Sequence, residues 1–200
     1  MASQAGMVDT IRSMGVTNKR VLDAVLSVDR ALFVYGDAYA DQPVPIGYGQ
    51  TTSQPYTVAR MIELLVENSK TQKLKNSKVL EVGTGGGWQT AILARLFKQV
   101  YSMELIPKLA RKAKRATSGL GLTNVEIKVG DGRSGWQDHA PFQGIIVSAD
   151  ADEVPPALVG QLVNRGRLVI PVKGEMRRGT KINSRIKWQS FGQYLFVPLV

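Results

Sequence analysis

The sequence predicts an α/β fold of the Rossmann-like, doubly wound kind: a mainly parallel sheet of about seven strands with helices on both faces, preceded by an N-terminal helical segment. From residue 78 onward, short apolar runs typical of buried strands alternate with segments of helical periodicity. The first apolar run ends in a cluster of glycines just before a helical segment. The length of 200 residues, of which 44% are hydrophobic, fits one domain with a sizeable core.

Two short helices are expected over residues 8–29, interrupted at "MGVTN". The second places four apolar side chains on one face: Val21, Leu22, Val25 and Val28. Residues 43–56 read as a loop, and a helix is expected after it because Pro55 suits a first turn. The apolar side chains of that helix recur at helical spacing: Val58, Met61, Ile62 and Leu65.

The remaining elements alternate between the two kinds of structure. Strands are predicted over residues 78–83, 99–105, 125–131, 144–150 and 166–172, and the closing segment 192–200 is expected to be one more. Helices are predicted over residues 88–97, 107–118 and 155–162. This order implies a parallel sheet, and ligands of such sheets bind at the carboxyl ends of the strands.

Composition excludes several classes of chemistry. The chain has no cysteine, so disulfides, thiolate metal sites and thiol catalysis are excluded, and no metal site is expected. No run approaches the roughly 20 apolar residues of a membrane span, so we expect a cytoplasmic protein without membrane contact. The net charge is +10, and residues 101–200 carry 15 basic against 8 acidic side chains. Such a surface attracts polyanions, although solubility alone also explains it.

Four polar or glycine-rich features fall where predicted strands end: "EVGTGGG" (81–87), Glu104, Asp131 and "SAD" (148–150). The glycines at 83, 85 and 87 let the backbone approach a ligand, and the helix that follows offers free N–H groups. A plain strand-to-helix turn is the alternative. Glu104 lies 21 residues after Gly83, the spacing at which a carboxylate usually binds a ribose diol, so together they favour nucleoside binding over a merely solvated carboxylate.

The glycine loop differs from the dinucleotide pattern G-x-G-x-x-G, because it reads G-T-G-G-G with Glu81 two residues before the first glycine. A carboxylate there can receive a ligand ammonium, directly or through water. The run E-x-G-x-G-x-G resembles the first motif of class I S-adenosylmethionine-dependent methyltransferases. The resemblance implies that S-adenosyl-L-methionine binds along Glu81, Gly83, Thr84, Gly85, Gly87, Glu104, Leu105, Asp131 and Gly132. It assigns the ribose to Glu104 and the adenine amino group to Asp131, whose alternative role is a turn residue.

Longer stretches of the sequence indicate which family of methyltransferases the chain resembles. "AYADQPVPIGYGQTTSQPYTVARM" followed by "KVLEVGTGGGWQTAILA" resembles the protein-L-isoaspartate O-methyltransferase family, as do "APFQGIIVSADADEVPPAL" and "QLVNRGRLVIPV". The resemblance covers residues 7–200. It implies that the chain methylates the α-carboxyl of isoaspartyl residues in damaged proteins and peptides, beginning their repair and releasing S-adenosyl-L-homocysteine.

The same resemblance assigns the loop before residue 58. It implies that this loop covers the reacting carboxylate, that Ser53 is the catalytic residue, and that Thr51, Thr52 and Gln54 support it. The chemistry agrees, because a carboxylate is already ionised at neutral pH and needs no general base. Helix capping is the competing role for Ser53. We therefore expect one methyltransferase domain over residues 1–200, with helices and covering loop in 7–57 and a Rossmann-like core in 58–200.

The sequence departs from the family pattern in a few places. Trp88 stands where a tyrosine is usual, Gly86 and Gly87 replace a serine-glycine pair, and the segments after Phe33 and Lys173 are shortened. These segments shape peptide access, so they bear on substrate preference. The single histidine, His139, is expected at the surface because no second ligand lies near it in the sequence.

Two other functions remain open from the residues alone. The positive charge suggests an RNA methyltransferase, but "SADADEVPP" lacks the aromatic side chain that would stack a flipped base. A non-catalytic relative that binds the cofactor or a peptide is the second alternative. We expect a monomer whose partners are isoaspartyl peptides and proteins, without a stable nucleic-acid partner.

Overall fold

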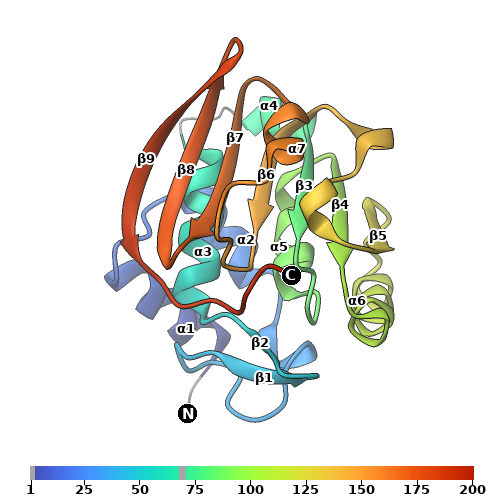
Figure 1. The fold of residues 1–200 in the computed structure, drawn as a ribbon. Helices are drawn as coiled ribbons and strands as arrows, with labels where there is room; N and C mark the ends of the chain where they lie inside the picture. Colours follow the sequence, from blue (N-terminus) through green and yellow to red (C-terminus); the bar gives the residue numbers. More distant parts are fainter. Residues whose placement is uncertain (1–2, 68–70) are drawn as a thin grey trace.

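The computed structural model describes residues 3–67 and 71–200 and contains a seven-stranded sheet in the order β5-β4-β3-β6-β7-β8-β9 (Figure 1). Its strands are β3 (Lys78–Val82), β4 (Gln99–Glu104), β5 (Val125–Val129), β6 (Phe142–Val147), β7 (Leu162–Val172), β8 (Glu175–Ile182) and β9 (Arg185–Gln193). The first five strands pair in parallel, and β8 and β9 are antiparallel. The predicted doubly wound, mainly parallel sheet is confirmed.

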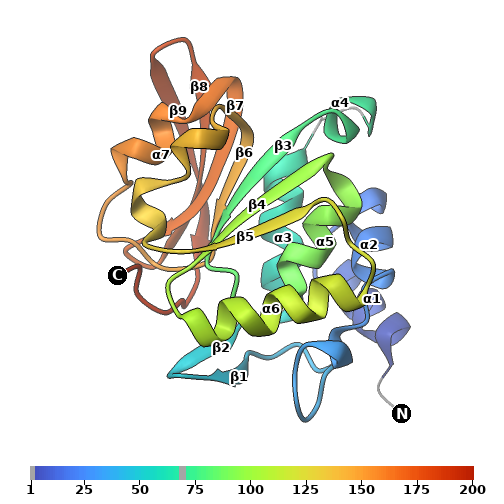
Figure 2. The same ribbon diagram turned by 90° about the vertical axis from the view of Figure 1, so that its right-hand side faces the viewer.

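Helices cover both faces of this sheet (Figure 2). They are α1 (Gln4–Ser13), α2 (Lys19–Leu26), α3 (Pro55–Val66), α4 (Thr71–Lys75), α5 (Trp88–Leu96), α6 (Pro107–Gly119) and α7 (Pro156–Gly160). Helices α2, α3 and α5 share the larger core cluster, whereas α7 packs into the other one. The predicted helices before residue 30 and after residues 54, 87, 106 and 155 are all present, with boundaries shifted by a few residues.

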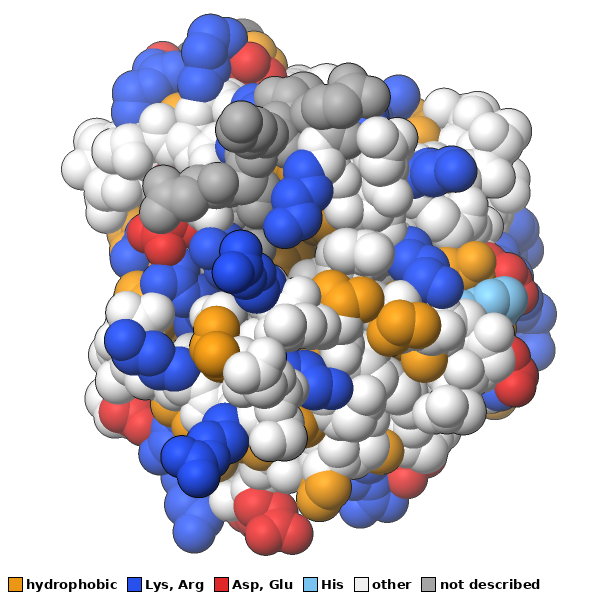
Figure 3. Space-filling model, turned by 90° about the horizontal axis from the view of Figure 1, so that it is seen from above, with side chains coloured by type: hydrophobic (Ala, Val, Ile, Leu, Met, Phe, Trp, Pro, Cys, Tyr) orange, Lys and Arg blue, Asp and Glu red, His pale blue; other side chains and the backbone are white. Residues whose placement is uncertain are grey.

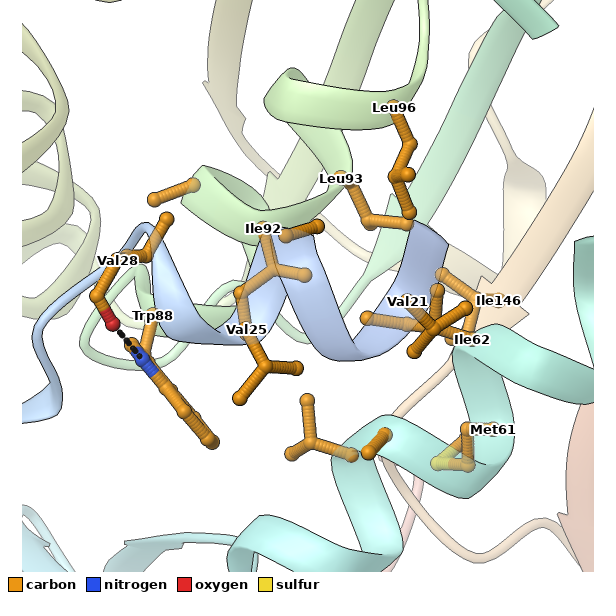
Figure 4. Close-up of a cluster of buried hydrophobic side chains, with 14 of the residues drawn as sticks. Val21, Val25, Val28, Met61, Ile62, Trp88, Ile92, Leu93, Leu96 and Ile146 are labelled. Atoms are coloured by element: carbon orange, nitrogen blue, oxygen red, sulfur yellow. Dashed lines mark hydrogen bonds between the residues drawn. The ribbon is translucent and has the colours of Figure 1, made fainter. Parts of the chain in front are cut away.

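The larger core joins the N-terminal helices to the sheet. Valines of α2 pack between Met61 and Ile62 of α3 and the apolar side of α5, as Figure 4 shows. The Trp88 indole lies in this cluster and donates a hydrogen bond from Nε1 to the Val28 carbonyl oxygen at 3.1 Å. This contact fixes the first turn of α5, and with it the glycine loop before that helix, against α2.

The segment predicted as a loop over 43–56 contains a small antiparallel hairpin of β1 (Val44–Gly47) and β2 (Gln50–Thr52). The turn Gly47-Tyr48-Gly49 has positive φ at all three residues, which glycine accommodates readily. The hairpin lies beyond the carboxyl ends of the central strands, beside α6 (Figures 1 and 2). It therefore covers the edge of the sheet at which ligands of this fold bind.

The C-terminal prediction was wrong in part. Residues 192–200 do not form a strand of their own: β9 ends at Gln193, and the tail after it bonds from the Tyr194 N–H to the Gly174 carbonyl oxygen and makes an isolated bridge between Pro198 and Asp150. The preceding basic segment instead forms the hairpin β8–β9. Strand β9 is an exposed edge strand, which explains its charged side chains, since such charges prevent edge-to-edge aggregation.

Charge is spread over the surface. At the end of the molecule opposite β1 and β2, Lys and Arg side chains are scattered among neutral ones (Figure 3). Within residues 3–67 and 71–200, no helix is long and apolar enough to cross a membrane. The same residues contain no cluster of three acidic or histidine side chains able to hold a metal ion.

Candidate active site

A cavity lies at the carboxyl ends of β3, β4 and β6, under the β1–β2 hairpin. Nine of the predicted site residues line it: Thr51, Thr52, Ser53, Gly83, Thr84, Gly85, Glu104, Leu105 and Gly132. The hairpin approaches the glycine loop closely, because a Cβ on Gly85 would lie 3.1 Å from Cδ1 of Ile46. The structure therefore brings the glycine loop, the strand-end carboxylate and the hydroxyl-rich segment together in one cavity.

Two glycines of the predicted set serve packing. A Cβ on Gly132 would lie 2.2 Å from Cγ1 of Val82, so no larger residue fits there without displacing β3. A Cβ on Gly87, which has φ 95°, would lie 3.0 Å from Cβ of Ala113 on α6. Gly87 does not line the cavity. It allows close contact between α5 and α6.

Glu104 is held in a fixed orientation at the cavity wall. Its Oε2 accepts a hydrogen bond from the Gly85 backbone N–H at 2.8 Å, and its Oε1 accepts one from the Ile106 N–H at 2.9 Å. The residue is only 6% exposed, yet it lines the cavity. Each carboxylate oxygen keeps a further lone pair for a ligand hydroxyl, which is the geometry that a ribose diol requires.

Glu81 does not line the cavity and lies behind it, fully buried. Its carboxylate accepts hydrogen bonds from Gln89 Nε2 (2.9 Å), Thr90 Oγ1 (2.5 Å) and Ser102 Oγ (2.6 Å). Burial raises the pKa of Glu81 to about 7, against the lowering effect of these hydrogen bonds, and the nearby Glu104 carboxylate raises it further. A direct contact with a ligand ammonium is not available in this arrangement, and any influence passes through Gln89, which does line the cavity.

Asp131 also lies outside the lining, although Gly130 and Gly132 on either side are part of it. The Asp131 carboxylate forms a bidentate pair with Arg133 and accepts that residue's backbone N–H, which caps the 3-10 turn 132–134. These bonds, chiefly the one from the Arg133 side chain, lower the pKa of Asp131. In this structure its contacts are those of the turn residue, the alternative to adenine binding.

The segment around Ser53 is fixed by Arg30, a residue that no sequence motif singles out. The Arg30 guanidinium is completely buried and donates to four backbone carbonyl oxygens: those of Ala38, Ala40, Gln42 and Ser53, at 3.0 to 3.3 Å. It also lies over the Trp88 ring, 5.2 Å from its centroid. Burial lowers the pKa of Arg30 to about 10, although Asp41 and Asp37 oppose this.

The capping role considered for Ser53 is wrong. The N-cap residue of α3 is Gln54, which makes no side-chain capping bond, and Asp41 Oδ1 instead accepts the Tyr56 N–H at 2.7 Å. Asp41 Oδ2 also accepts from Gln54 Nε2 at 3.2 Å. Within the described residues, no hydrogen bond occupies the Ser53 hydroxyl, so this group is free to contact a ligand.

A second, more open cavity of about 770 Å³ adjoins the first. It is bounded by the N-terminus of α3, Met14 and the C-terminal segment 191–197. Gln54 lines this cavity and not the first. His139 lines neither; its ring stacks on Tyr101 at a centroid distance of 3.9 Å.

The first cavity suits a nucleoside that carries positive charge and no phosphate. Among the described residues that line it, none is Lys, Arg or His, and Glu104 is the one charged side chain. A phosphate would be poorly accommodated beside that carboxylate, whereas a sulfonium or ammonium group would be attracted to it. Apolar walls from Val82, Leu105 and Leu109 suit a purine ring. The donor set therefore fits S-adenosyl-L-methionine.

This sheet order, with a glycine loop after β3 and a carboxylate at the end of β4, defines the class of Rossmann-like methyltransferases. A family model described as "Protein-L-isoaspartate(D-aspartate) O-methyltransferase (PCMT)" matches residues 2–200, and the chain belongs to this family. A protein-L-isoaspartate O-methyltransferase of Pelodictyon phaeoclathratiforme is 45% identical over 202 residues, covering 97% of this chain and 89% of the relative. One of Geobacter metallireducens is 52% identical over 171 residues, covering 83% and 76%.

A solved structure has the same fold. The Plasmodium falciparum protein described as a protein-L-isoaspartate O-methyltransferase, in complex with S-adenosyl-L-homocysteine, superposes with a TM-score of 0.89 at 24% identity. The match covers 100% of this chain and 99% of that structure. At this identity the likeness establishes the fold, which extends over the whole chain.

Proposed function

We propose that this protein transfers a methyl group from S-adenosyl-L-methionine to the free α-carboxyl of L-isoaspartyl residues in damaged proteins and peptides. The observation that carries the proposal is the position of Ser53, which lines both the first cavity and the second one. A donor in the first cavity and a peptide in the second would meet at this hydroxyl. Family membership supports the same substrate.

The donor would be held by the glycine loop and Glu104, with the ribose hydroxyls on the free lone pairs of that carboxylate. When bound, it supplies an electrophilic methyl group on a sulfonium. Glu81 and Asp131 act indirectly. Glu81 orients the Gln89 side chain, and Asp131 fixes the turn that carries Gly132. Leu105 and Thr84 complete the wall.

The substrate carboxylate is ionised at neutral pH and attacks without a general base. The protein has to orient it, bring it near contact distance and exclude water. Ser53 would donate a hydrogen bond to the carboxylate, and Thr51, Thr52 and Gln54 would shape the entry around it. The Arg30 contacts hold the backbone of this segment in place, which limits the cost of ordering it when substrate binds.

We further propose that residues 1–200 act as one domain, with the covering segment in 7–57 and the cofactor-binding core in 58–200. The protein would work as a cytoplasmic monomer without a stable nucleic-acid partner. The scattered surface charge and the placement of β1–β2 over the core support these points.

The test is to incubate the protein with methyl-labelled donor and with three substrates: an isoaspartyl peptide, the matched aspartyl peptide and RNA. Label released as methanol in base from the isoaspartyl peptide alone supports the proposal. Alkali-stable label on RNA would identify an RNA methyltransferase instead. A protein that binds the donor but labels none of the three would be a non-catalytic relative.

A further inference from the structure

The two cavities share four lining residues: Thr51, Ser53, Ser148 and Val197. Three of them carry a hydroxyl group. Two of these hydroxyls come from the covering segment, and the third, that of Ser148, comes from the sheet. Ser148 directly follows β6, and its backbone N–H donates to the Val82 carbonyl oxygen at 2.9 Å. It is therefore anchored to the central strand and cannot move with the covering segment.

The orientation of the Ser148 hydroxyl is set by the side chain of Gln89. Its Oγ accepts a hydrogen bond from Gln89 Nε2 at 2.8 Å, and the same nitrogen donates to Glu81 Oε1 at 2.9 Å. An amide nitrogen only donates, so the Glu81 carboxylate fixes which end of the Gln89 amide faces Ser148.

Glu81 is itself fixed by two hydroxyl groups. Thr90 and Ser102 both donate to its Oε2. The one hydrogen of the Ser102 hydroxyl is used in this bond, so the 2.5 Å contact between Thr84 and Ser102 has Thr84 as the donor. The Glu81 carboxylate therefore accepts from Ser102 on one side and from Gln89 on the other, and the second hydrogen of the Gln89 amide is donated to Ser148.

A hydroxyl that accepts from Gln89 has its own hydrogen left to donate. In the part of the chain that the structure describes, nothing accepts the Ser148 hydrogen. We propose that Ser148 is a second substrate-contacting residue, which donates a hydrogen bond to the isoaspartyl carboxylate where the two cavities meet, with Gln89 and Glu81 as positioning residues. This inference rests on the proposed function. Ser53 would hold the carboxylate from the covering segment and Ser148 from the sheet.

The first test replaces the hydroxyl. In Ser148→Ala, kcat/KM for the isoaspartyl peptide should fall about 10- to 100-fold, since a hydrogen bond to a charged group is lost. The affinity for S-adenosyl-L-homocysteine, measured by calorimetry, should change less than about twofold. Ser148→Thr keeps the donor and should restore most of the activity. Ser118→Ala, an exposed serine in the last turn of α6, is the matched control.

A binding measurement separates substrate contact from folding. Binding of the isoaspartyl peptide to protein saturated with S-adenosyl-L-homocysteine should weaken in Ser148→Ala and not in Ser148→Thr, at equal melting temperatures. If Ser148→Ala leaves peptide binding and kcat/KM unchanged while the wild type is active, the inference fails and the proposed function stands. If the cofactor affinity falls as much as the activity does, Ser148 serves the cofactor and the inference is also wrong.

The second test addresses the positioning residues. Gln89→Met removes the amide at similar size and leaves the Ser148 hydroxyl free to rotate. Its effect on kcat/KM for the peptide, measured at saturating donor so that donor binding does not contribute, should be several-fold in the wild-type background and should vanish in the Ser148→Ala background, because the two residues act as one unit. Additive effects would show that Gln89 acts by another route. A wild type that methylates no isoaspartyl peptide would instead refute the proposed function, and the inference with it.

Discussion

The floor and the cover of the active-site cavity are built in different ways. The floor, at the ends of β3 and β4, is a set of buried side chains that bond to one another, with Glu104 and Glu81 fixed by backbone N–H groups and hydroxyls. The cover, residues 38–54, buries the apolar side chains of Ala38, Val44 and Ile46, and its backbone is fixed by the Arg30 guanidinium, which binds four of its carbonyl oxygens. Cofactor affinity should therefore depend on the floor, and turnover on the cover.

The largest effect is expected for the cover when its anchor is removed. Arg30→Met leaves four carbonyl oxygens without their donor in a buried site, so the free energy of unfolding should fall by about 3 kcal/mol or more. Denaturant unfolding measures this. Arg12→Met, which breaks an exposed ion pair with Asp9, should change it by less than about 1 kcal/mol. Equal losses in the two variants would contradict the anchoring role.

The next effect tests the floor. Glu104→Ala should weaken binding of S-adenosyl-L-homocysteine about 100-fold, since the ribose hydroxyls lose a charged acceptor and the Gly85 N–H loses its partner. Calorimetry gives the dissociation constant. Glu126→Ala, a carboxylate on β5 that lines neither cavity, serves as the control. Unchanged cofactor affinity in Glu104→Ala would remove the main argument for a nucleoside in this cavity.

A smaller effect is expected for Ser53 in the cover. Ser53→Ala should lower kcat about 10-fold while cofactor affinity and melting temperature stay near those of the wild type, because the side chain does not cap α3. A stopped assay for methanol release gives kcat. A variant that loses thermal stability at unchanged kcat would restore the capping role that the structure argues against.

The smallest effect concerns the pH dependence of the free energy of unfolding, to which Glu81 in the floor contributes. The pKa of Glu81 is raised from its ordinary value to about 7 in the folded state, so folding favours the protonated form. The associated stability is present at low pH and is lost as the pH rises toward the folded pKa. Between pH 6 and pH 8 the wild type should lose about 1 kcal/mol more than Glu81→Gln. Denaturant melts at several pH values measure the difference, and parallel curves would contradict it.

The sequence predicted the floor better than the cover. Strand ends, glycines and Glu104 were predictable because alternating periodicity fixes a parallel sheet and the sheet fixes where its carboxyl ends meet. Long-range hydrogen bonding has no such local pattern. Arg30 reads as an ordinary basic residue between two helical segments, and its acceptors lie 8 to 23 residues away in irregular chain.

One expectation stays a prediction and another was wrong. The resemblance assigned the adenine amino group to Asp131, whose carboxylate in this structure pairs with Arg133 two residues later. The tail after residue 193 was predicted as a strand from its apolar residues, yet the sheet edge is already filled by β9.

The absence of basic side chains among the described residues of the cavity wall has a consequence for successive turnovers. Methyl transfer converts a cationic sulfonium into a neutral thioether. A wall whose one charged side chain is a carboxylate attracts the sulfonium, and this part of the attraction is lost once the sulfur is a neutral thioether. Electrostatics alone therefore favour replacement of the product by fresh donor. Removing the negative charge of this wall should strengthen product inhibition.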